Sequence, residues 1–354
     1  MNTPDTTASE HTRGSSRITP PTTGGEASIL GLGAYRPRRL VSNEQLVERI
    51  DSTDQWIRSR SGIVTRRFAD EDETVAAMSV AASRQALAEG GIDAGQLDCV
   101  IVATVSHLLQ TPSVAAQITH ELGATPAAAF DVSAACAGFC YGVSLAADMV
   151  RAGSARHVLV IGVERLSDLL DLTDRSTAFI FADGAGAAIV GPSDEPGIGP
   201  VVWGSDGERF DLIRQETPWP VDPDPGEEPD PDSHKGAHVL RMEGGPVFRW
   251  ASFEMAKVAQ RTLEATGLTV DDLDLFVPHQ ANMRITDLMA RALGLPPHVV
   301  IARDIAEQGN TSAASVPLAL RRLVDDGSAH SGDLALLIAF GAGLAYAAQV
   351  VRMP

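Results

Sequence analysis

A long-range internal repeat is the feature that most constrains how this chain of 354 residues can fold. The run LDCVI at residues 97–101 recurs as LDLFV at residues 273–277, and each run leads to a histidine, His107 or His279. A glycine-containing segment precedes both runs, so each has the pattern of a buried strand that follows the end of a helix. A repeated unit of this kind predicts a duplicated fold.

Two further pairs of segments extend the repeat: FDV at 130–132 with RDI at 303–305, and GAGA at 184–187 with GAGL at 341–344. We therefore expect two similar halves, residues 27–198 and residues 199–354. Duplicated halves place corresponding strand-to-helix turns against each other, so segments that are far apart in the sequence are expected to meet at one site.

Within both halves, short apolar runs alternate with longer helical patterns, which indicates an α/β fold. Three runs have the composition of buried strands: CVIVATV at 99–105, HVLVIGV at 157–163 and LALLIAF at 334–340. These runs are far too short to span a bilayer, and the first residues lack the pattern of a signal peptide, so a cytoplasmic protein is expected.

Two polar segments stand apart from this pattern. Residues 1–26 have no hydrophobic period and are expected to form a disordered tail. Residues 218–235 (PWPVDPDPGEEPDPDSHK) alternate prolines with acids, which excludes both helices and sheet ladders. We interpret this segment as a solvated surface loop, with an active-site flap as the alternative.

The net charge of −18 argues against binding to nucleic acid or to anionic membranes, and an anionic substrate would need a local basic pocket. The three cysteines, Cys99, Cys136 and Cys140, are too few for a disulfide framework. The CxxxC spacing of the last two has no further ligands, so no metal site is expected.

Cys136 directly follows a predicted strand and precedes a predicted helix. The unpaired N–H groups at a helix N-terminus stabilise a thiolate, so this position suits a nucleophile. A small buried cysteine packed against alanine and glycine is an equally good interpretation of this feature alone. Cys99 and Cys140 fit the packing interpretation better.

His279 and Asn310 are candidates for the same site. His279 follows Pro278 at the carboxyl end of a predicted strand, where ligands bind in α/β folds, although a lone histidine at such a place is more often structural than catalytic. Asn310 lies in a turn that enters a helix, where its ordinary role would be an N-cap. A neutral histidine and an asparagine that donate to one oxyanion would stabilise an enolate.

Together these residues resemble the β-ketoacyl-acyl carrier protein synthase III family of the thiolase superfamily. The resemblance spans roughly residues 28–354. It rests on five motifs: DSTDQWIRSR at 51–60, DVSAACAGF at 131–139, VPHQANMR at 277–284, GNTSAASVP at 309–317 and FGAGL at 340–344. It implies duplicated βαβαβαββ halves that form a five-layered αβαβα architecture.

The resemblance also implies a reaction in two stages. Cys136 is acylated by an acyl-CoA primer, with the backbone N–H groups of Cys136 and Ala342 holding the oxyanion. Malonyl-acyl carrier protein then loses carbon dioxide while His279 and Asn310 stabilise the enolate, and the carbanion attacks the acyl-cysteine. Thioester and cysteine chemistry implies no cofactor.

Substrate contacts follow from the same resemblance. Trp56, Arg60 and Arg175 are expected to bind coenzyme A by stacking and phosphate pairing, with Asn282 near the pantetheine arm. The alternatives are a packed aromatic and two surface charges. The carrier-protein surface is expected to be a small basic patch of Arg249, Arg284 and Arg291.

One position bears on the primer. In members of the family that select acetyl, a phenylalanine reaches across the dimer interface and closes the primer pocket, and the matching residue here is Thr111. The resemblance therefore implies a homodimer with a larger pocket, and we expect isobutyryl or methylbutyryl primers to be accepted beside acetyl.

We interpret the chain as the condensing enzyme that initiates fatty acid synthesis. Three alternatives remain: a starter-unit enzyme of a polyketide pathway, an acyltransferase that uses the cysteine without condensation, and a carrier-protein-binding subunit without activity. The presence of Cys136, His279 and Asn310 argues against the last two.

Overall fold

The computed structural model describes residues 24–215 and 239–354. The predicted acidic loop at 218–235 and most of the predicted tail at 1–26 lie outside these described residues. The first strand begins at Glu26, the last residue of the predicted tail.

Two five-stranded sheets form the frame of the molecule. The first sheet has the order β1-β7-β6-β4-β5. Its strands are β1 (Glu26–Tyr35), β4 (Cys99–Ala103), β5 (Ala128–Val132), β6 (Val158–Arg165) and β7 (Asp183–Ser193). The second sheet has the order β8-β14-β13-β11-β12. Its strands are β8 (Val202–Gly204), β11 (Leu275–Pro278), β12 (Val300–Ile301), β13 (Leu334–Phe340) and β14 (Tyr346–Arg352).

The two sheets have the same topology, which agrees with a duplicated fold. In the first, β4 runs parallel to β5 and β6, and β7 is antiparallel to its neighbours. In the second, β11 runs parallel to β12 and β13, and β14 is antiparallel to its neighbours. The repeated LD pair directly precedes the equivalent strands β4 and β11, each second from one edge of its sheet. Its aspartates have the same role, because Asp98 accepts a hydrogen bond from the His157 N–H and Asp274 accepts one from the Leu334 N–H.

The two weaker matches of the repeat do not align equivalent residues. GAGA at 184–187 lies inside β7, whereas GAGL at 341–344 forms the turn between β13 and β14. FDV at 130–132 ends β5, and RDI at 303–305 follows its counterpart β12, so this second match is out of alignment by one residue. Short glycine and aspartate motifs recur in both strands and turns, so sequence similarity alone misaligned them.

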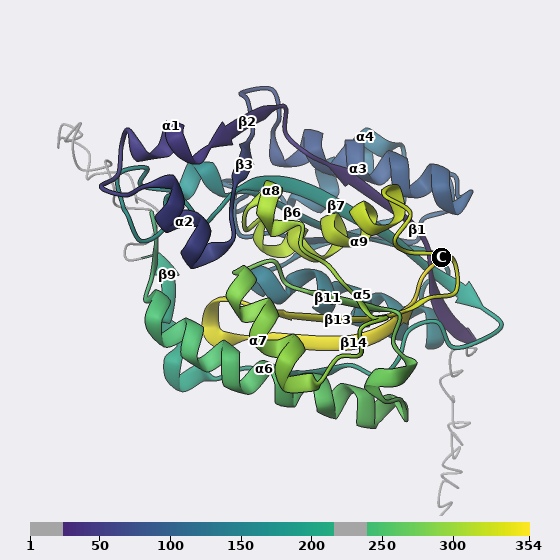
Figure 1. The fold of residues 1–354 in the computed structure, drawn as a ribbon. Helices are drawn as coiled ribbons and strands as arrows, with labels where there is room; N and C mark the ends of the chain where they lie inside the picture. Colours follow the sequence, from purple (N-terminus) through teal and green to yellow (C-terminus); the bar gives the residue numbers. More distant parts are fainter. Residues whose placement is uncertain (1–23, 216–238) are drawn as a thin grey trace, which may run out of the picture.

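Helices fill three layers around the sheets (Figure 1). One outer layer packs on the first sheet and consists of α3 (Val75–Gly90) and α4 (Val114–Leu122). The middle layer lies between the sheets and consists of α5 (Gly138–Arg151) and α9 (Ser315–Asp325). The other outer layer packs on the second sheet and consists of α6 (Gly244–Thr266) and α7 (Met283–Leu293). The predicted five-layered αβαβα architecture is confirmed.

The remaining elements border this frame. They are the helices α1 (Asn43–Val47), α2 (Asp54–Ser61) and α8 (Ile305–Gln308), and the two-stranded sheets of β2 (Arg39–Ser42) with β3 (Thr65–Phe68) and of β9 (Ile213–Gln215) with β10 (Leu240–Met242). Short 3₁₀ helices are η1 (Ala94–Gln96), η2 (Ala135–Ala137), η3 (Leu166–Leu169), η4 (Gly207–Leu212), η5 (Val270–Asp272), η6 (Ser312–Ala314) and η7 (Ala342–Leu344). Among the described residues, none of the helices has the length and apolar character needed to cross a membrane.

Close packing in the middle layer brings the two halves together. Gly162 in β6 lies against the backbone of η6 in the other half, and a Cβ on this glycine would lie 2.2 Å from the carbonyl oxygen of Ala313. Any side chain there would force the halves apart. The turns that begin α5 and α9 therefore lie side by side, and these turns carry Cys136 and Asn310.

Candidate active site

Cys136 lies in η2, between the carboxyl end of β5 and the first turn of α5. The preceding residue, Ala135, has a left-handed backbone conformation with φ of 45°. Such a conformation is strained for a residue with a side chain and often occurs at functional sites. Cys136 retains 8% exposure and lines a cavity of about 850 Å³. By contrast, Cys99 and Cys140 are buried in the core, as expected.

The turn after β13 lies directly against Cys136. A Cβ on Gly341 would lie 2.5 Å from the backbone nitrogen of Cys136, so only glycine permits this approach. Ala342 follows in the same turn and lines the cavity together with Cys136. The backbone N–H groups of Cys136 and Ala342 thus belong to adjacent segments, as an oxyanion hole requires, and that role stays a prediction.

The pKa of Cys136 is shifted by burial and by a neighbouring hydroxyl. Burial raises the pKa of the thiol to about 12, and a hydrogen bond with Ser312 acts in the opposite direction. The helix end was expected to stabilise the thiolate, and burial acts against that stabilisation.

His279 follows β11 and lines the same cavity. Its Nδ1 lies 2.6 Å from the hydroxyl of Ser315, and that hydroxyl also accepts a hydrogen bond from the Gln280 N–H at 3.3 Å. The Phe340 ring packs against the imidazole edge to face. Burial lowers the pKa of His279 to about 3, so the ring is neutral. With Nδ1 accepting from Ser315, Nε2 carries the hydrogen and can donate.

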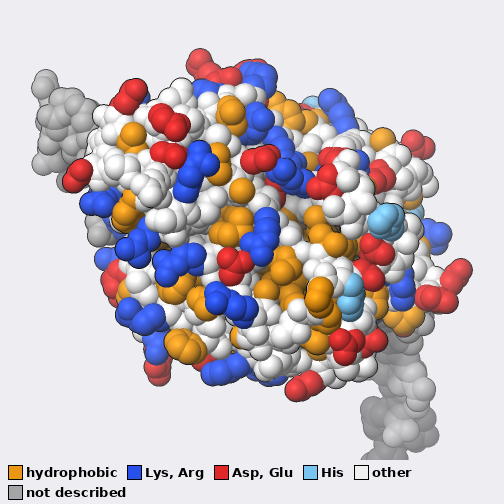
Figure 2. Space-filling model, viewed as in Figure 1, with side chains coloured by type: hydrophobic (Ala, Val, Ile, Leu, Met, Phe, Trp, Pro, Cys, Tyr) orange, Lys and Arg blue, Asp and Glu red, His pale blue; other side chains and the backbone are white. Residues whose placement is uncertain are grey.

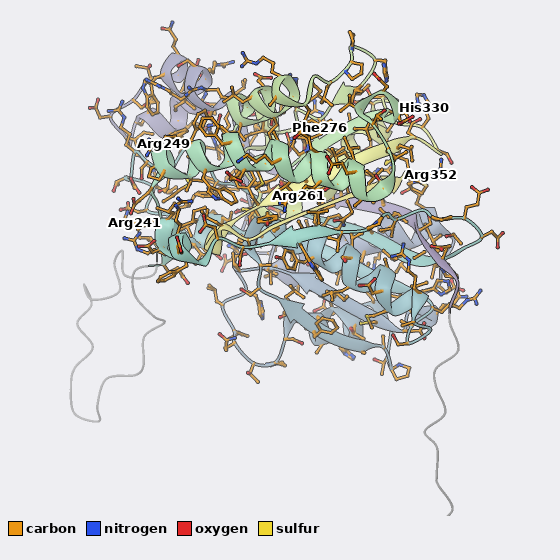
Figure 3. The ribbon with its side chains drawn as sticks, turned by 90° about the horizontal axis from the view of Figure 1, so that it is seen from below. Arg241, Arg249, Arg261, Phe276, His330 and Arg352 are labelled. Atoms are coloured by element: carbon orange, nitrogen blue, oxygen red, sulfur yellow. The ribbon has the colours of Figure 1, made fainter. Side chains whose placement is uncertain are left out.

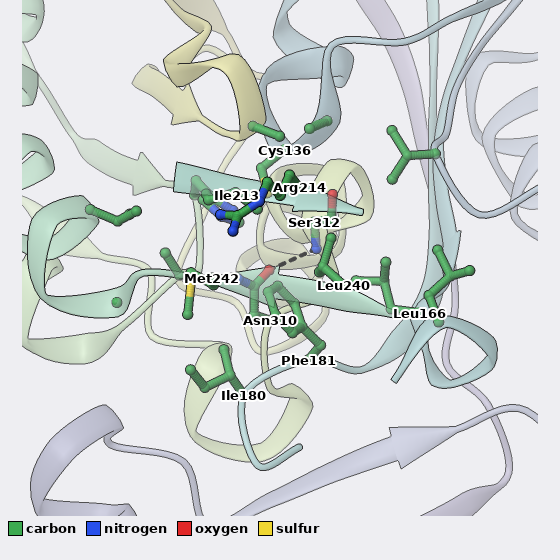
Figure 4. Close-up of a pocket in the computed structure, with 18 of the residues that line it drawn as sticks. Cys136, Leu166, Ile180, Phe181, Ile213, Arg214, Leu240, Met242, Asn310 and Ser312 are labelled. Carbon is green, nitrogen blue, oxygen red and sulfur yellow. Dashed lines mark hydrogen bonds between the residues drawn. The ribbon is translucent and has the colours of Figure 1, made fainter. Parts of the chain in front are cut away.

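Asn310 is held in place by backbone and side-chain hydrogen bonds. Its backbone forms a bridge with Phe181, and its Oδ1 accepts a hydrogen bond of 2.8 Å from the Ser312 N–H (Figure 4). Because the oxygen is occupied, the amide NH₂ group is the part of the side chain that is left to donate to a ligand. Both His279 and Asn310 can therefore donate a hydrogen bond into the cavity that contains Cys136.

Two polar residues of this region were missed in the sequence. Glu164, near the carboxyl end of β6, is completely buried. Its Oε1 accepts a hydrogen bond of 3.0 Å from the hydroxyl of Ser312, a residue that lines the cavity together with Cys136. Glu164 directly follows the predicted strand at 157–163. A glutamate at the carboxyl end of a buried strand was the sequence feature that could have identified it as a site residue.

Trp56 in α2 lies between two arginines. The guanidinium carbon of Arg175 lies 4.8 Å from the centre of the indole ring, and that of Arg60 lies 5.9 Å from it. All three residues line the cavity. Asn282 lines it as well, but its side chain caps α7 through the Arg284 N–H and donates to the Arg60 carbonyl oxygen. The four residues predicted to contact coenzyme A are thus gathered at one rim, and their binding role stays a prediction.

The three arginines predicted to bind the carrier protein are exposed on α6 and α7. Arg284 stacks on the ring of Phe248, which precedes Arg249 in α6, and Arg249 and Arg284 both line the cavity. Arg291 lies two turns further along α7, outside the cavity lining. Figure 2 shows basic side chains gathered over α2, α6 and α7 on this face, and Figure 3 shows Arg249 near one end of α6.

Thr111 does not line the cavity of the single chain. It is exposed, in a segment where Leu109 and Gln110 do line the cavity. The prediction for Thr111 concerned a pocket completed by a second subunit, so its role stays a prediction. The strands that flank the predicted acidic loop, β9 and β10, contribute Ile213, Leu240 and other residues to the cavity wall (Figure 4).

Two family models match the chain. The model described as "3-Oxoacyl-[acyl-carrier-protein (ACP)] synthase III" matches residues 130–207, and its C-terminal counterpart matches residues 263–353. The matched segments contain Cys136 in the first case and His279 and Asn310 in the second. Each half of the site is therefore covered by one model.

Curated relatives match over nearly the whole chain. "Beta-ketoacyl-[acyl-carrier-protein] synthase III 1" of Streptomyces coelicolor is 58% identical and covers 96% of this chain and 100% of its own length. "Beta-ketoacyl-[acyl-carrier-protein] synthase III" of Streptomyces glaucescens is 57% identical with the same coverage.

Solved structures match as well. A priming β-ketosynthase from the R1128 polyketide biosynthetic pathway has a TM-score of 0.89 and 48% identity, and covers 96% of this chain and 99% of its own. 3-oxoacyl-[acyl-carrier-protein] synthase III from Aquifex aeolicus has a TM-score of 0.83 and 35% identity, and the match covers 92% of this chain and 99% of that one.

The duplicated five-layered fold, with a cysteine, a histidine and an asparagine around one cavity, defines a condensing enzyme of the thiolase superfamily. The relatives narrow this class further. The chain belongs to the β-ketoacyl-[acyl-carrier-protein] synthase III family.

Proposed function

We propose that this enzyme starts fatty acid synthesis by condensing an acyl-CoA primer with malonyl-acyl carrier protein. The observation that carries the proposal is the meeting of Cys136, His279 and Asn310 at one cavity. The names of the relatives support the same reaction. We also propose a cytoplasmic location.

In the first half-reaction, the thioester of the primer is attacked by the sulfur of Cys136. The N–H groups of Cys136 and Ala342 receive the oxyanion, coenzyme A leaves, and the acyl group stays on the cysteine. Trp56, Arg60 and Arg175 would hold the adenine and phosphates of coenzyme A at the rim. Their mutual stacking supports this role, since both guanidinium groups are fixed beside the indole.

In the second half-reaction, the malonyl thioester loses carbon dioxide. Its carbonyl oxygen becomes an enolate that accepts hydrogen bonds from Nε2 of His279 and from the Asn310 amide. Each such donor contributes a few kcal/mol to the transition state, about 3 to 4 in other oxyanion holes. The carbanion then attacks the acyl-cysteine, and the C–S bond to Cys136 breaks. The exposed arginines Arg249, Arg284 and Arg291 would attract the carrier protein.

The primer pocket is proposed to depend on a homodimer. β5 is an edge strand of the first sheet, and Phe130 on it is 38% exposed. Leu108 and Leu109 next to Thr111 are exposed as well, so apolar side chains and an open strand edge occur together. The small side chain of Thr111 supports acceptance of isobutyryl and methylbutyryl primers.

The primer proposal is tested by competition between acetyl-CoA and isobutyryl-CoA. The wild type is expected to use both, and Thr111→Phe is expected to shift use toward acetyl. A strong preference of the wild type for acetyl would contradict the enlarged pocket. Measurement of the molecular mass in solution tests the homodimer separately.

A second candidate function is the priming of a polyketide chain. The 48% identical priming β-ketosynthase of the R1128 pathway favours it. The chemistry is the same, so the carrier protein distinguishes the two. Faster turnover with the fatty acid carrier protein of the same organism than with polyketide carrier proteins would support initiation of fatty acid synthesis.

The reaction itself is tested by two measurements on the whole enzyme. Mass spectrometry after incubation with acyl-CoA should find an adduct on Cys136, and its absence would favour a carrier-protein-binding subunit. Labelled carbon dioxide should be released from malonyl-acyl carrier protein, and an acyltransferase without condensation would release none. Cys136→Ser is the matched variant, which should lose the thioester adduct.

A further inference from the structure

Arg66 is a buried charge whose hydrogen bonds go to neutral oxygens. It lies in β3, its exposed fraction is 0%, and it is the largest fully buried side chain in the described part of the protein. Its guanidinium group binds two backbone carbonyls and one side-chain amide, and no carboxylate of the described residues is bonded to it. Burial lowers the pKa of Arg66 to about 10, so the group stays charged at neutral pH.

The stability of the fold does not account for an arginine at this position. A charge without a counter-ion is costly to bury, and an apolar side chain of similar volume commonly gives equal or greater stability. The cost is not completely recovered here, because the Nε atom of Arg66 has no hydrogen-bond partner among the described residues. The groups that Arg66 does bind point to a different role.

The guanidinium group joins three segments of the chain. Its Nη2 donates to the side-chain oxygen of Asn43 at 2.6 Å and to the carbonyl oxygen of Phe179 at 3.0 Å. Its Nη1 donates to the carbonyl oxygen of Val41 at 3.4 Å. A guanidinium group is planar and presents its donors in fixed directions, so it holds these oxygens in a defined arrangement. The Phe179 carbonyl is thereby tied to β2 and to the start of α1.

The segment that follows Phe179 carries Asn310. The Asn310 N–H donates to the Ile180 carbonyl oxygen at 2.9 Å, and the Ala182 N–H donates to the Asn310 carbonyl oxygen at 2.8 Å. These bonds form the bridge between Phe181 and Asn310, and Figure 4 shows Ile180 and Phe181 beside Asn310. A shift of this segment would therefore move the backbone of Asn310 as well.

The stem of Arg66 supports Asn310 from the other direction along the chain. Gly309 directly precedes Asn310 and has a left-handed backbone with φ of 68°. A Cβ on Gly309 would lie 3.0 Å from the Cβ of Arg66 and 3.2 Å from the Ile180 carbonyl oxygen. The turn that leads to Asn310 is thus packed closely against Arg66. One residue contacts both backbone segments that determine where Asn310 lies.

We propose that Arg66 is a positioning residue for Asn310, which keeps the amide directed into the cavity by fixing the two backbone segments around it. This role rests on the proposed condensation, in which the Asn310 amide stabilises the enolate. Arg66 itself is absent from the cavity lining. Displacement of a catalytic group by about 1 Å can cost on the order of a hundredfold in rate. Loss of Arg66 should therefore slow the half-reaction that uses Asn310 and spare the other.

The test measures the two half-reactions separately in Arg66→Met and Arg66→Lys. Methionine fills a similar volume without hydrogen-bond donors, whereas lysine keeps the charge and part of the donors. Release of labelled carbon dioxide from malonyl-acyl carrier protein by preformed acyl-enzyme should slow about ten- to hundredfold in Arg66→Met, and less in Arg66→Lys. Acylation of Cys136 at saturating acyl-CoA should stay within a few-fold of the wild type.

A double variant shows whether Arg66 acts through Asn310. Asn310→Ala removes the amide that Arg66 is proposed to position. In that background, Arg66→Met should slow carbon dioxide release no further, because residues that act as a unit have non-additive effects. Losses that add in the double variant would overturn the proposal.

Ile118→Ala is the control for a general loss of stability. Ile118 is completely buried in α4, in the outer layer on the first sheet. This variant should lower the melting temperature without a preference for either half-reaction. If Arg66→Met loses both half-reactions equally, as Ile118→Ala is expected to do, Arg66 is structural only and the proposal is wrong.

Arg66→Lys keeps the test decisive if Arg66→Met does not fold. It is judged by the same criteria, alone and combined with Asn310→Ala. Unchanged carbon dioxide release in a folded Arg66→Met or in Arg66→Lys would also overturn the positioning role. A wild type that forms the acyl-enzyme but releases no carbon dioxide would instead contradict the proposed condensation itself.

Discussion

The hydroxyl of Ser315 lies 2.6 Å from Nδ1 of His279, at the point where α9 begins beside the end of β11. The same hydroxyl accepts the Gln280 N–H, and among the described residues Nδ1 is the one acceptor in contact with it, so we assign the hydroxyl hydrogen to the imidazole. This contact assigns the hydrogen of the neutral ring to Nε2. A donor for the enolate is therefore prepared before the malonyl substrate arrives.

The first prediction concerns this contact. Ser315→Ala leaves Nδ1 without its donor, so the ring can adopt the other tautomer and present an acceptor to the enolate. We expect condensation to slow roughly ten- to hundredfold, which corresponds to about 1 to 3 kcal/mol for a buried hydrogen bond. Acylation of Cys136 should keep its rate. Single-turnover product formation from preformed acyl-enzyme measures the effect, and an equal loss of acylation would contradict it.

The second prediction concerns pH. Burial holds the pKa of His279 at about 3, so the ring stays neutral at every pH above this value and gains a charge only below it. Carbon dioxide release by preformed acyl-enzyme should therefore not change through protonation of His279 between about pH 5 and about pH 8. Single-turnover release of labelled carbon dioxide across this range is the measurement. A fall in the rate near the ordinary pKa of histidine that His279→Gln abolishes would show a charged, solvated ring.

The third prediction concerns Gly341. A methyl group there would lie 2.5 Å from the backbone nitrogen of Cys136. Gly341→Ala should push the turn of Ala342 away from the nucleophile and disturb the oxyanion hole. Removal of one such donor costs about a hundred- to a thousandfold in rate. Acylation kinetics measure the effect, and Gly95→Ala is the control because a Cβ there meets no atom within 4 Å.

The fourth prediction concerns the carrier protein. Arg284→Glu should lower turnover with malonyl-acyl carrier protein by reversing a charge at the cavity rim, and should spare acylation by acyl-CoA. A charge pair at a binding surface contributes mainly to association, so we expect KM to rise about tenfold or more, with the effect weakening at high salt. Arg261→Glu is the control, because Arg261 lies farther along α6 from Arg249 (Figure 3). An equal loss in both half-reactions would refute the assignment.

The fifth prediction concerns coenzyme A. Trp56→Ala removes the ring on which Arg60 and Arg175 stack. We expect KM for acyl-CoA to rise about tenfold, since a stacking contact of this kind is worth about 1 to 3 kcal/mol. The rate of condensation from preformed acyl-enzyme should not change. Trp203→Ala, which changes a partly exposed tryptophan outside the cavity, is the matched control.

Several elements were predictable from the sequence because they depend on local patterns. The run at 334–340 forms β13 with the predicted bounds, and β4 and β6 fall within one or two residues of theirs. The repeated LD pair correctly aligned the equivalent strands β4 and β11 of the two halves. The GAGA match was wrong, because such a short motif suits a strand and a turn equally well.

The amino-acid sequence by itself determined the duplicated α/β fold and the three residues around which the site is built. Their segments carry distinct local patterns, and the duplication predicted that they would meet. The tertiary structure decided the burial of Cys136, the tautomer of His279 and the contact of Glu164 with Ser312. These properties depend on burial and on partners far away in the chain, since Glu164 and Ser312 are 148 positions apart. No local pattern encodes such a contact, because it exists only once both sheets have packed against the middle layer.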